Sequence, residues 1–309
     1  MTAPLLTSDK VLTEFAVEVG ESGPIAIEGG RTRWTRGGTL AKGTRVLKAP
    51  SGVVDFQPDE MIVIVRAGTT VSELDEALAA QGQRSALPNR GGTVGGALAV
   101  GENDVAVLGK GMVRTSLLEV RYVSGEGKLI RGGGPTVKNV TGFDIPRIMV
   151  GSLGTLGCIA EVILRTNPIP AVSQWYEASG VDPFDIRDVI LRPGAILWNG
   201  STTYVLLEGH AVDVADQLHD LSHLGRFLES EGPPELPQHR WSLAPSDLRT
   251  LNRFDMGLFV ASIGVGVVYA EKPQPRRDVS DAVRQVSERL KTNFDPTARL
   301  NPGRCAWRV

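Results

Sequence analysis

The sequence predicts an α+β protein with about two domains. A chain of 309 residues is long enough for two domains of roughly 150 residues each. Segments typical of strands and of helices mix along it without a strict βαβ alternation, which argues against a simple doubly wound sheet. Residues 167–172 (NPIPAV) carry two prolines within three residues, and this stretch indicates a domain boundary.

The first elements are expected close to the N-terminus. Residues 8–19 are expected to form a helix with Ser8 as its N-cap. Residues 24–30 (PIAIEGG) are typical of a strand that enters a turn. Residues 60–68 (EMIVIVRAG) form an apolar run that predicts a buried strand.

A helix, a hairpin and another strand follow. Thr70 and Glu73 have the spacing of a capping box, and Gly82 suits the position just after a helix end, which together predict a helix here. Residues 117–133 alternate on both arms around SGEG, and this pattern predicts a hairpin. Residues 157–166 (GCIAEVILRT) are expected to form a further strand.

The second half mixes the same two kinds of element. Strands are expected over residues 195–200 (AILWNG) and 203–209 (TYVLLEG). Residues 258–270 (LFVASIGVGVVYA) are apolar and interrupted by glycines, which suggests adjoining buried strands. Helices are expected over residues 211–224 and 280–294.

Composition argues against several classes of function. The formal net charge of −2 gives no electrostatic reason to expect nucleic acid or an anionic membrane surface as a partner. The two cysteines form neither a disulfide framework nor a C-x-x-C motif. Residues 1–10 lack a basic region followed by an apolar core, so no signal peptide is expected. The longest uncharged apolar stretch, residues 256–270, is shorter than the roughly 20 residues of a membrane span.

Four glycine clusters lie in the first half, at residues 28–34 (EGGRTRW), 90–100 (RGGTVGGALAV), 109–115 (GKGMVRT) and 151–157 (GSLGTLG). Glycine lets a ligand approach the main chain, and successive amides can form a nest that binds anions. The first cluster follows a strand, and the second can aim a helix N-terminus at a phosphate. Two such loops could hold a pyrophosphate from two sides, although each cluster alone is also typical of a tight turn.

Neither standard nucleotide motif is present. GSLGTLG differs from the G-x-G-x-x-G of Rossmann folds, and GKG lacks the serine or threonine of a Walker A loop. The hypothesis is therefore a dinucleotide held by a fold other than the Rossmann fold.

Taken in order, these motifs resemble the FAD-linked oxidases of the p-cresol methylhydroxylase/vanillyl-alcohol oxidase superfamily. Within it, the chain is most similar to the FAD-binding subunits of heteromeric glycolate oxidases. The resemblance covers about residues 20–170 and 280–304, and its most specific segment is KNVTGFDIPRIMVGSLGTLG, residues 138–157. The C-terminal match is FDPTARLNPGR, residues 294–304.

The resemblance implies a two-subdomain FAD-binding fold of the p-cresol methylhydroxylase type with a small α+β cap domain. Residues 1–170 would form the FAD-binding domain and residues 171–275 the cap or substrate domain. Residues 276–309 would return to the FAD-binding domain. The chain departs from the family pattern at two places. The segment of residues 101–111 (GENDVAVLGKG) is shorter and more acidic than the glycine-rich stretch that the family often has, and Arg31 stands where many relatives have a small or polar residue.

By matching position, the resemblance assigns FAD contacts to Gly29, Gly30, Arg31, Thr32, Gly92, Thr93, Val94, Gly95, Gly96, Gly111, Val113, Arg114, Gly154, Gly157 and Ile159. Relatives that tether FAD use a histidine, cysteine or tyrosine. This chain has no histidine before residue 210, Cys158 lies in an apolar run and Tyr122 lies on a hairpin strand. FAD is therefore expected to be held non-covalently.

The resemblance also implies a reaction and partners. The chemistry expected is hydride transfer from the α-carbon of a small 2-hydroxy acid to flavin, in a complex with a catalytic flavoprotein subunit and an iron–sulfur subunit. Two cysteines are too few to hold an iron–sulfur cluster in this chain. Such a protein would be cytoplasmic and could meet a membrane through its partners.

The catalytic residues cannot be assigned from the sequence. Arg240, Arg249 and Arg253 are candidate carboxylate clamps, but no base is evident. His219 and His223 are spaced for zinc, yet a third ligand is lacking, so no metal is expected. Two alternatives stay open: a stand-alone FAD oxidase or dehydrogenase, and a non-catalytic structural subunit with a vestigial flavin site.

Overall fold

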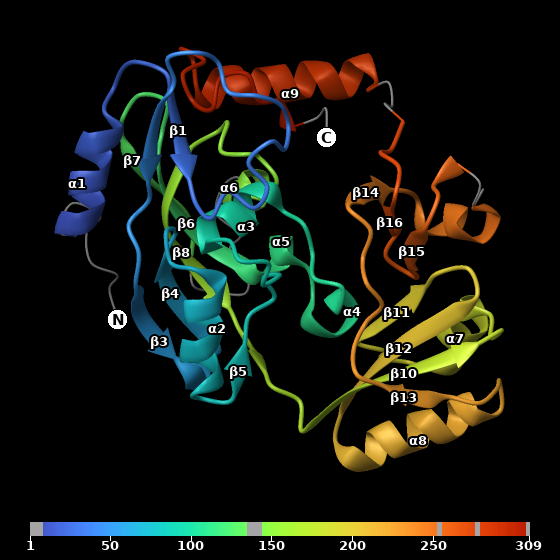
Figure 1. Ribbon diagram of the computed structural model, residues 1–309. Coiled ribbons are helices and arrows are strands. Elements are labelled where there is room, and N and C mark those ends of the chain that lie inside the picture. Colours follow the sequence, from blue (N-terminus) through green and yellow to red (C-terminus); the bar gives the residue numbers. More distant parts are fainter. Residues whose placement is uncertain (1–8, 135–143, 252–254, 276–278, 307–309) are drawn as a thin grey trace. The chain divides into compact units, whose positions relative to one another are not determined.

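The computed structural model describes residues 9–134, 144–251, 255–275 and 279–306 (Figure 1). The chain divides into two compact units. The first unit comprises Met1–Asp104, Met112–Pro168 and Asp278–Val309, and the second comprises Val105–Gly111 and Ile169–Arg277. Each unit mixes helices with antiparallel sheet, as the α+β prediction requires. No helix of the described residues is long and apolar enough to cross a membrane.

The first unit is built on a five-stranded antiparallel sheet. Its strand order is β3-β4-β8-β6-β7. The bounds are β3 (Val53–Gln57), β4 (Ile62–Arg66), β8 (Cys158–Arg165), β6 (Leu117–Val123) and β7 (Leu129–Gly133). Two small pairs complete the strands of this unit: the parallel pair β1 (Ile25–Glu28) and β2 (Arg45–Lys48), and the antiparallel pair β5 (Gln83–Arg84) and β9 (Asn167–Pro168).

The central strand β8 separates two hydrophobic cores. One core gathers apolar residues of α2 (Val71–Ala79), α3 (Val94–Val100), β4 and β6, together with Val162 and Leu164 of β8. The other core gathers α1 (Lys10–Val19) and β1, together with Cys158 and Ala160. Both faces of β8 are covered, which agrees with a strand that is apolar except for Glu161 and the terminal Arg165.

A β-bulge in β8 decides which core each side chain joins. Tyr122 of β6 pairs with Ile159 and Arg121 pairs with Glu161, so Ala160 has no partner of its own on β6. The extra residue turns Ile159 and Glu161 to opposite faces of the sheet. Ile159 joins the core of α2 and α3, whereas Glu161 forms ion pairs on the other face.

Local sequence signals explain most helix boundaries in this unit. The predicted capping box is confirmed, since the Thr70 hydroxyl accepts from the Glu73 amide and the Glu73 carboxylate accepts from the Thr70 amide. The expectation of Ser8 as the first N-cap is wrong. Asp9 caps α1, because its Oδ1 accepts from the amides of Val11 at 3.0 Å and Leu12 at 3.2 Å. The remaining helices of this unit are α5 (Val113–Ser116), α6 (Ile145–Met149), α9 (Asp281–Phe294) and the 3-10 turn Pro58–Glu60.

The second unit holds a seven-stranded antiparallel sheet in the order β13-β10-β12-β11-β15-β16-β14. The strands are β10 (Val172–Ser179), β11 (Ala195–Trp198), β12 (Thr202–Gly209), β13 (Leu228–Ser230), β14 (His239–Ser242), β15 (Phe259–Ser262) and β16 (Val267–Ala270). Its helices are α4 (Val107–Lys110), α7 (Pro183–Val189), α8 (Ala211–Ser222) and the 3-10 segment Pro245–Thr250. One core packs Ile186 and Leu221 of the helices against Ile196 and Val205 of the sheet.

The observed division differs from the expected domain limits in one segment. Residues 105–111 were expected in the first domain but belong to the second unit. The physical reason is that α4 packs on β11 and β12 side chains, and the Gly109 amide donates to the Gly194 carbonyl at 3.2 Å. The other limits fall at Pro168 and Asp278, within a few residues of those expected.

Candidate cofactor-binding site

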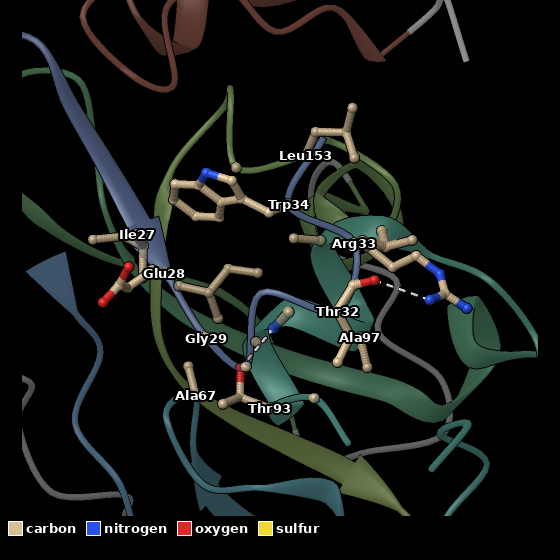
Figure 2. A pocket seen from close by; sticks show the side chains of 18 of the residues that line it. Ile27, Glu28, Gly29, Thr32, Arg33, Trp34, Ala67, Thr93, Ala97 and Leu153 are labelled. Carbon is tan, nitrogen blue, oxygen red and sulfur yellow. Dashed lines mark hydrogen bonds between the residues drawn. The ribbon is translucent and has the colours of Figure 1, made fainter. Parts of the chain in front are cut away.

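A deep pocket lies within the first unit, between the loop after β1, helix α3 and the segment before β8 (Figure 2). Its empty volume is about 1030 Å³, counting the part that opens to solvent. Of the fifteen residues expected to contact FAD, eleven line it: Gly29, Gly30, Arg31, Thr32, Gly92, Thr93, Gly95, Gly96, Gly154, Gly157 and Ile159. Three glycine clusters that are far apart in the sequence therefore meet at one cavity.

The loop after β1 presents a run of unused amides. In the described part of the chain, the amides of Gly30, Arg31, Thr32 and Arg33 donate to no acceptor, whereas the next amide, that of Trp34, donates to the Arg31 carbonyl. Arg31 has a φ of 56°, in the left-handed region that non-glycine residues rarely adopt. Successive amides around a left-handed residue form a concave nest that suits an anion.

Two side-chain contacts hold the left-handed Arg31 in place. Its Nε donates to Glu28 Oε2 at 2.7 Å, and its guanidinium lies 5.1 Å from the centre of the Trp34 ring. The Arg304 guanidinium also lies over Trp34, at 4.3 Å, and its Nη2 donates to the Trp34 carbonyl at 2.7 Å. Burial lowers the pKa of Arg304 from its ordinary value.

Gly29 and Gly30 allow two loops to pack together, in addition to leaving room for a ligand. A Cβ on Gly29 would lie 2.3 Å from Thr93 Oγ1, and one on Gly30 would lie 2.5 Å from the Gly91 carbonyl oxygen. The loop after β1 therefore packs directly on the loop before α3. The φ of Gly30 is not in the left-handed region, so close approach rather than backbone conformation requires glycine there.

The expectation that α3 aims its N-terminus at a phosphate is wrong. The amides of Val94 and Gly95 donate to the carbonyls of Thr69 and Ala67, at 2.9 and 2.8 Å. The Gly96 amide donates to Thr93 Oγ1 at 3.2 Å, as Figure 2 shows. Because the chain itself satisfies these donors, α3 offers the pocket small side chains and not an anion site.

The segment before β8 closes another wall of the pocket. Gly154 has a φ of 69°, and a Cβ on it would lie 2.3 Å from Asn301 Nδ2. That amide group donates to the Leu153 carbonyl at 3.0 Å, which ties the C-terminal segment to this wall. Gly157 packs against the Tyr122 ring, and the bulge in β8 turns Ile159 toward the pocket.

Four expected contact residues lie elsewhere. Val94 and Val113 are fully buried in the core of the first unit. Gly111 ends α4 in the second unit, and Arg114 is exposed on α5. These four do not line the pocket.

The most specific sequence segment is only partly visible. Its residues 138–143 lie outside the described residues. Asp144 caps α6 as expected, with its Oδ1 accepting from the Arg147 amide at 3.4 Å. Arg253, one of the three candidate clamps, also lies outside the described residues.

Sequence reasoning noted the positive charge of Arg31 and Arg33 but missed other residues of the pocket wall. These are Trp34, Arg90, Glu102, Asn301 and Arg304. The sequence signals for this positive wall were the two arginines close to Trp34 in the first glycine cluster and the arginine at the end of the C-terminal LNPGR. Among the lining residues, four arginines face two glutamates, so the wall carries a formal charge of +2. A doubly charged diphosphate is complementary to such a wall.

The pocket offers no group to tether a flavin and no metal site. No histidine, cysteine or tyrosine is among the described lining residues. Cys158 is buried in the other core, and burial raises the pKa of its thiol to about 12. Nowhere in the described residues do three or more metal-ligating side chains gather.

Comparison with known proteins agrees with this geometry. Residues 9–133 match the model of the family described as FAD binding domain. The chain is 31% identical to the glycolate oxidase subunit GlcE of Escherichia coli over 170 residues, which are 54% of this chain and 49% of that protein. It is 32% identical to a D-lactate dehydrogenase of Archaeoglobus fulgidus over 161 residues, which are 51% of this chain and 36% of the relative. The chain thus spans half or less of the length of these two relatives.

The fold has counterparts among solved structures. Alkyldihydroxyacetonephosphate synthase superposes with a TM-score of 0.69, covering 94% of this chain and 73% of that protein, at 16% identity. At this identity the likeness shows the fold alone, and it is the FAD-binding fold that the motifs predicted. Residues 9–133 are therefore an FAD binding domain, the cofactor of this domain is FAD, and over about half of its length the chain is similar to the glycolate oxidase subunit and the D-lactate dehydrogenase named above.

Proposed function

We propose that this chain binds FAD non-covalently in the pocket of the first unit and serves as a subunit of a 2-hydroxy-acid dehydrogenase complex of the glycolate oxidase type. The observation that carries the proposal is the row of unused amides from Gly30 to Arg33, all four of which belong to residues that line a pocket with a positively charged wall. The diphosphate of FAD is the anion that such a nest and such a wall would bind.

The remaining lining suits the other parts of the cofactor. Ile27, Val100, Leu153 and Ile159 supply apolar surface, and the small residues Ala97 and Ala99 leave room beside α3. Planar rings gain most from such surfaces, because burial removes apolar area from water. When bound, FAD would supply the capacity to accept a hydride from the α-carbon of a hydroxy acid.

Among the described residues that line the pocket, none is a histidine, cysteine, tyrosine or lysine that could take up the proton in that reaction. The pocket's two carboxylates, Glu28 and Glu102, are both paired with arginines. A general base must reach the hydroxyl that loses its proton, and a carboxylate already shared among arginines is a poor candidate. This arrangement supports the subunit proposal over the alternative of a stand-alone oxidase.

The proposed partners follow from the same reasoning and from the relatives. The Escherichia coli relative is named as a subunit of glycolate oxidase. The two cysteines of this chain, Cys158 and Cys305, cannot hold an iron–sulfur cluster, which usually needs four thiolates. We therefore expect a catalytic flavoprotein subunit and an iron–sulfur subunit to complete the complex, and electrons to leave through them.

Two measurements test the proposal. Purified chain should bind FAD in a titration, and acid or heat denaturation should release all flavin into the supernatant. A protein that takes up no FAD would instead support the non-catalytic alternative with a vestigial site, and flavin that stays with the denatured polypeptide would show a covalent bond. Turnover of glycolate or D-lactate by the isolated chain with an artificial electron acceptor would support the stand-alone alternative.

A further inference from the structure

We propose that Glu102 is a positioning residue that holds Arg33 and Arg90 in place for the diphosphate of the bound dinucleotide. The inference rests on the proposed FAD site, and Glu102 would act through the two arginines and not through a contact of its own with the diphosphate. Glu102 lies in the segment directly after α3.

The backbone around Glu102 is fixed on both sides. Gly101 ends α3 in the left-handed region, with a φ of 70°. A Cβ on Gly101 would lie 2.8 Å from the Gly151 amide nitrogen, so the turn packs directly on the segment before β8. The Glu102 side chain that follows is only 8% exposed.

The buried carboxylate contacts three guanidinium groups. Its Oε2 lies 3.4 Å from Arg33 Nε and 3.2 Å from Arg90 Nη1, and its Oε1 lies 3.1 Å from Arg36 Nη2. Arg33 and Arg36 come from the loop after β1, and Arg90 comes from the loop before α3. Glu102 therefore joins the two glycine loops whose backbones meet at Gly30 and Gly91.

Two of the three arginines belong to the wall of the pocket. Arg33 and Arg90 line the pocket and their side chains are 39% and 26% exposed, whereas Arg36 does not line it. Guanidinium groups bind phosphate oxygens through several donors, but a mobile arginine loses conformational entropy on binding. A carboxylate that already fixes both side chains reduces that loss. Glu102 thus improves diphosphate binding through the arginines it holds.

A purely structural role makes a different prediction. In that case, loss of Glu102 would loosen the loops and weaken every ligand alike. If the charge of Glu102 merely offset that of the arginines, its removal would strengthen binding of anions. The positioning role predicts weaker binding of ligands that carry a diphosphate, with little effect on ligands that lack one.

The test uses the full chain freed of flavin, with FAD, ADP and adenosine as probes in calorimetric titrations. We expect Glu102→Gln to lower the affinity for FAD and for ADP at least ten-fold, and the affinity for adenosine less than two-fold. Arg36→Gln is the matched control, because it removes a partner of the same carboxylate outside the pocket, and it should change ADP affinity less than three-fold. In a double-mutant cycle, Glu102→Gln should cost less ADP affinity in the Arg90→Gln background than in wild type, because only Arg33 would then remain for Glu102 to hold.

Several outcomes would contradict the positioning role of Glu102. Equal or tighter binding of ADP by Glu102→Gln would overturn the inference, and so would an equal loss for ADP and adenosine together with a lower Tm of the ligand-free protein. Should Glu102→Gln not fold, Glu102→Asp keeps the charge but shortens its reach, and it should weaken ADP several-fold while adenosine is unchanged. Failure of the wild-type chain to bind FAD and ADP would instead contradict the proposed function.

Discussion

Two groups of arginines and carboxylates in the first unit differ in balance and in purpose. Inside the five-stranded sheet, Arg66, Arg121 and Arg131 form ion pairs with Asp9, Glu119 and Glu161. Around the pocket, the lining carries four arginines and two glutamates. The sheet network is balanced, and its central members Arg66, Arg121, Glu119 and Glu161 are buried, whereas Asp9 and Arg131 at its edges are 27% and 33% exposed. The pocket wall instead carries an excess of positive charge that a bound anion would neutralise.

The difference shows that arginine–carboxylate pairs can either join strands or prepare a site for an anion. In the sheet network, neighbouring strands supply opposite charges: Arg66 Nε of β4 lies 3.1 Å from Glu161 Oε2 of β8, and Arg131 Nη2 of β7 lies 2.7 Å from Glu119 Oε2 of β6. A buried charge is tolerated only when it is paired, so this network specifies strand neighbours. In the pocket, an anion from outside the chain would complete the pairing.

The largest effect should follow from breaking the sheet network. Glu161→Ala leaves Arg66 and Arg121 without their shared carboxylate in a buried site, which we expect to lower the free energy of unfolding by about 3–5 kcal/mol. Urea denaturation of the ligand-free protein measures it. Glu126→Gln, which removes an exposed pair with Lys128, is the control and should leave the midpoint unchanged. A loss below about 1 kcal/mol would contradict the role assigned to the network.

The next effect concerns the pocket alone. Gly30→Val places a Cβ against the Gly91 carbonyl oxygen, so one glycine loop must move away from the other. We expect FAD affinity to fall at least a hundred-fold, with a loss of stability of about 1–3 kcal/mol typical of overpacking. Gly134→Val is the control, because a Cβ there meets nothing within 4 Å. Wild-type affinity in Gly30→Val would show that this loop does not hold the cofactor.

A smaller effect should appear in acid, at the edge of the sheet network. Burial opposes ionisation of Asp9, but bonds from Arg66 and from the Leu12 and Val11 amides outweigh it and hold the pKa of Asp9 below its ordinary value. An acid with a lowered pKa stabilises the fold above its unfolded pKa of about 3.9, and this stability is lost as pH falls through the folded pKa.

Asp9→Asn isolates that contribution, since asparagine caps a helix about as well as aspartate. We expect wild type to exceed Asp9→Asn by about 1 kcal/mol at pH 6 and by progressively less below pH 4. Thermal unfolding of both proteins from pH 3 to 6 measures the difference. A difference that is constant over this range would contradict the assigned pairing with Arg66.

The smallest effect is a difference in thiol reactivity. Cys158 is buried in the core that also covers α1, and burial raises its pKa to about 12, so very little thiolate forms at pH 8. Cys305 is partly exposed. A thiol reagent should therefore label Cys305 in the native protein and Cys158 only after unfolding. Equal labelling rates would show that this core opens readily.

Much of the local structure could be predicted because neighbouring residues determine it. The capping box at Thr70 and Glu73 spans three residues, and the hairpin of β6 and β7 closes through a turn of a few residues. The glycine clusters likewise indicated where one backbone segment packs closely on another or on a pocket. Eleven of the fifteen expected contact residues line one pocket for this reason.

The sequence by itself determined the α+β class, most element positions and the loops that form the pocket, since these depend on patterns within a few residues. Only the tertiary structure decided that Gly30 packs on Gly91, that the bulge at Ala160 turns Ile159 to the pocket, and that residues 105–111 join the second unit. Glu102 meets Arg33 across 69 positions of sequence. No short-range pattern encodes such a contact, because it exists only once the sheet has brought the two loops together.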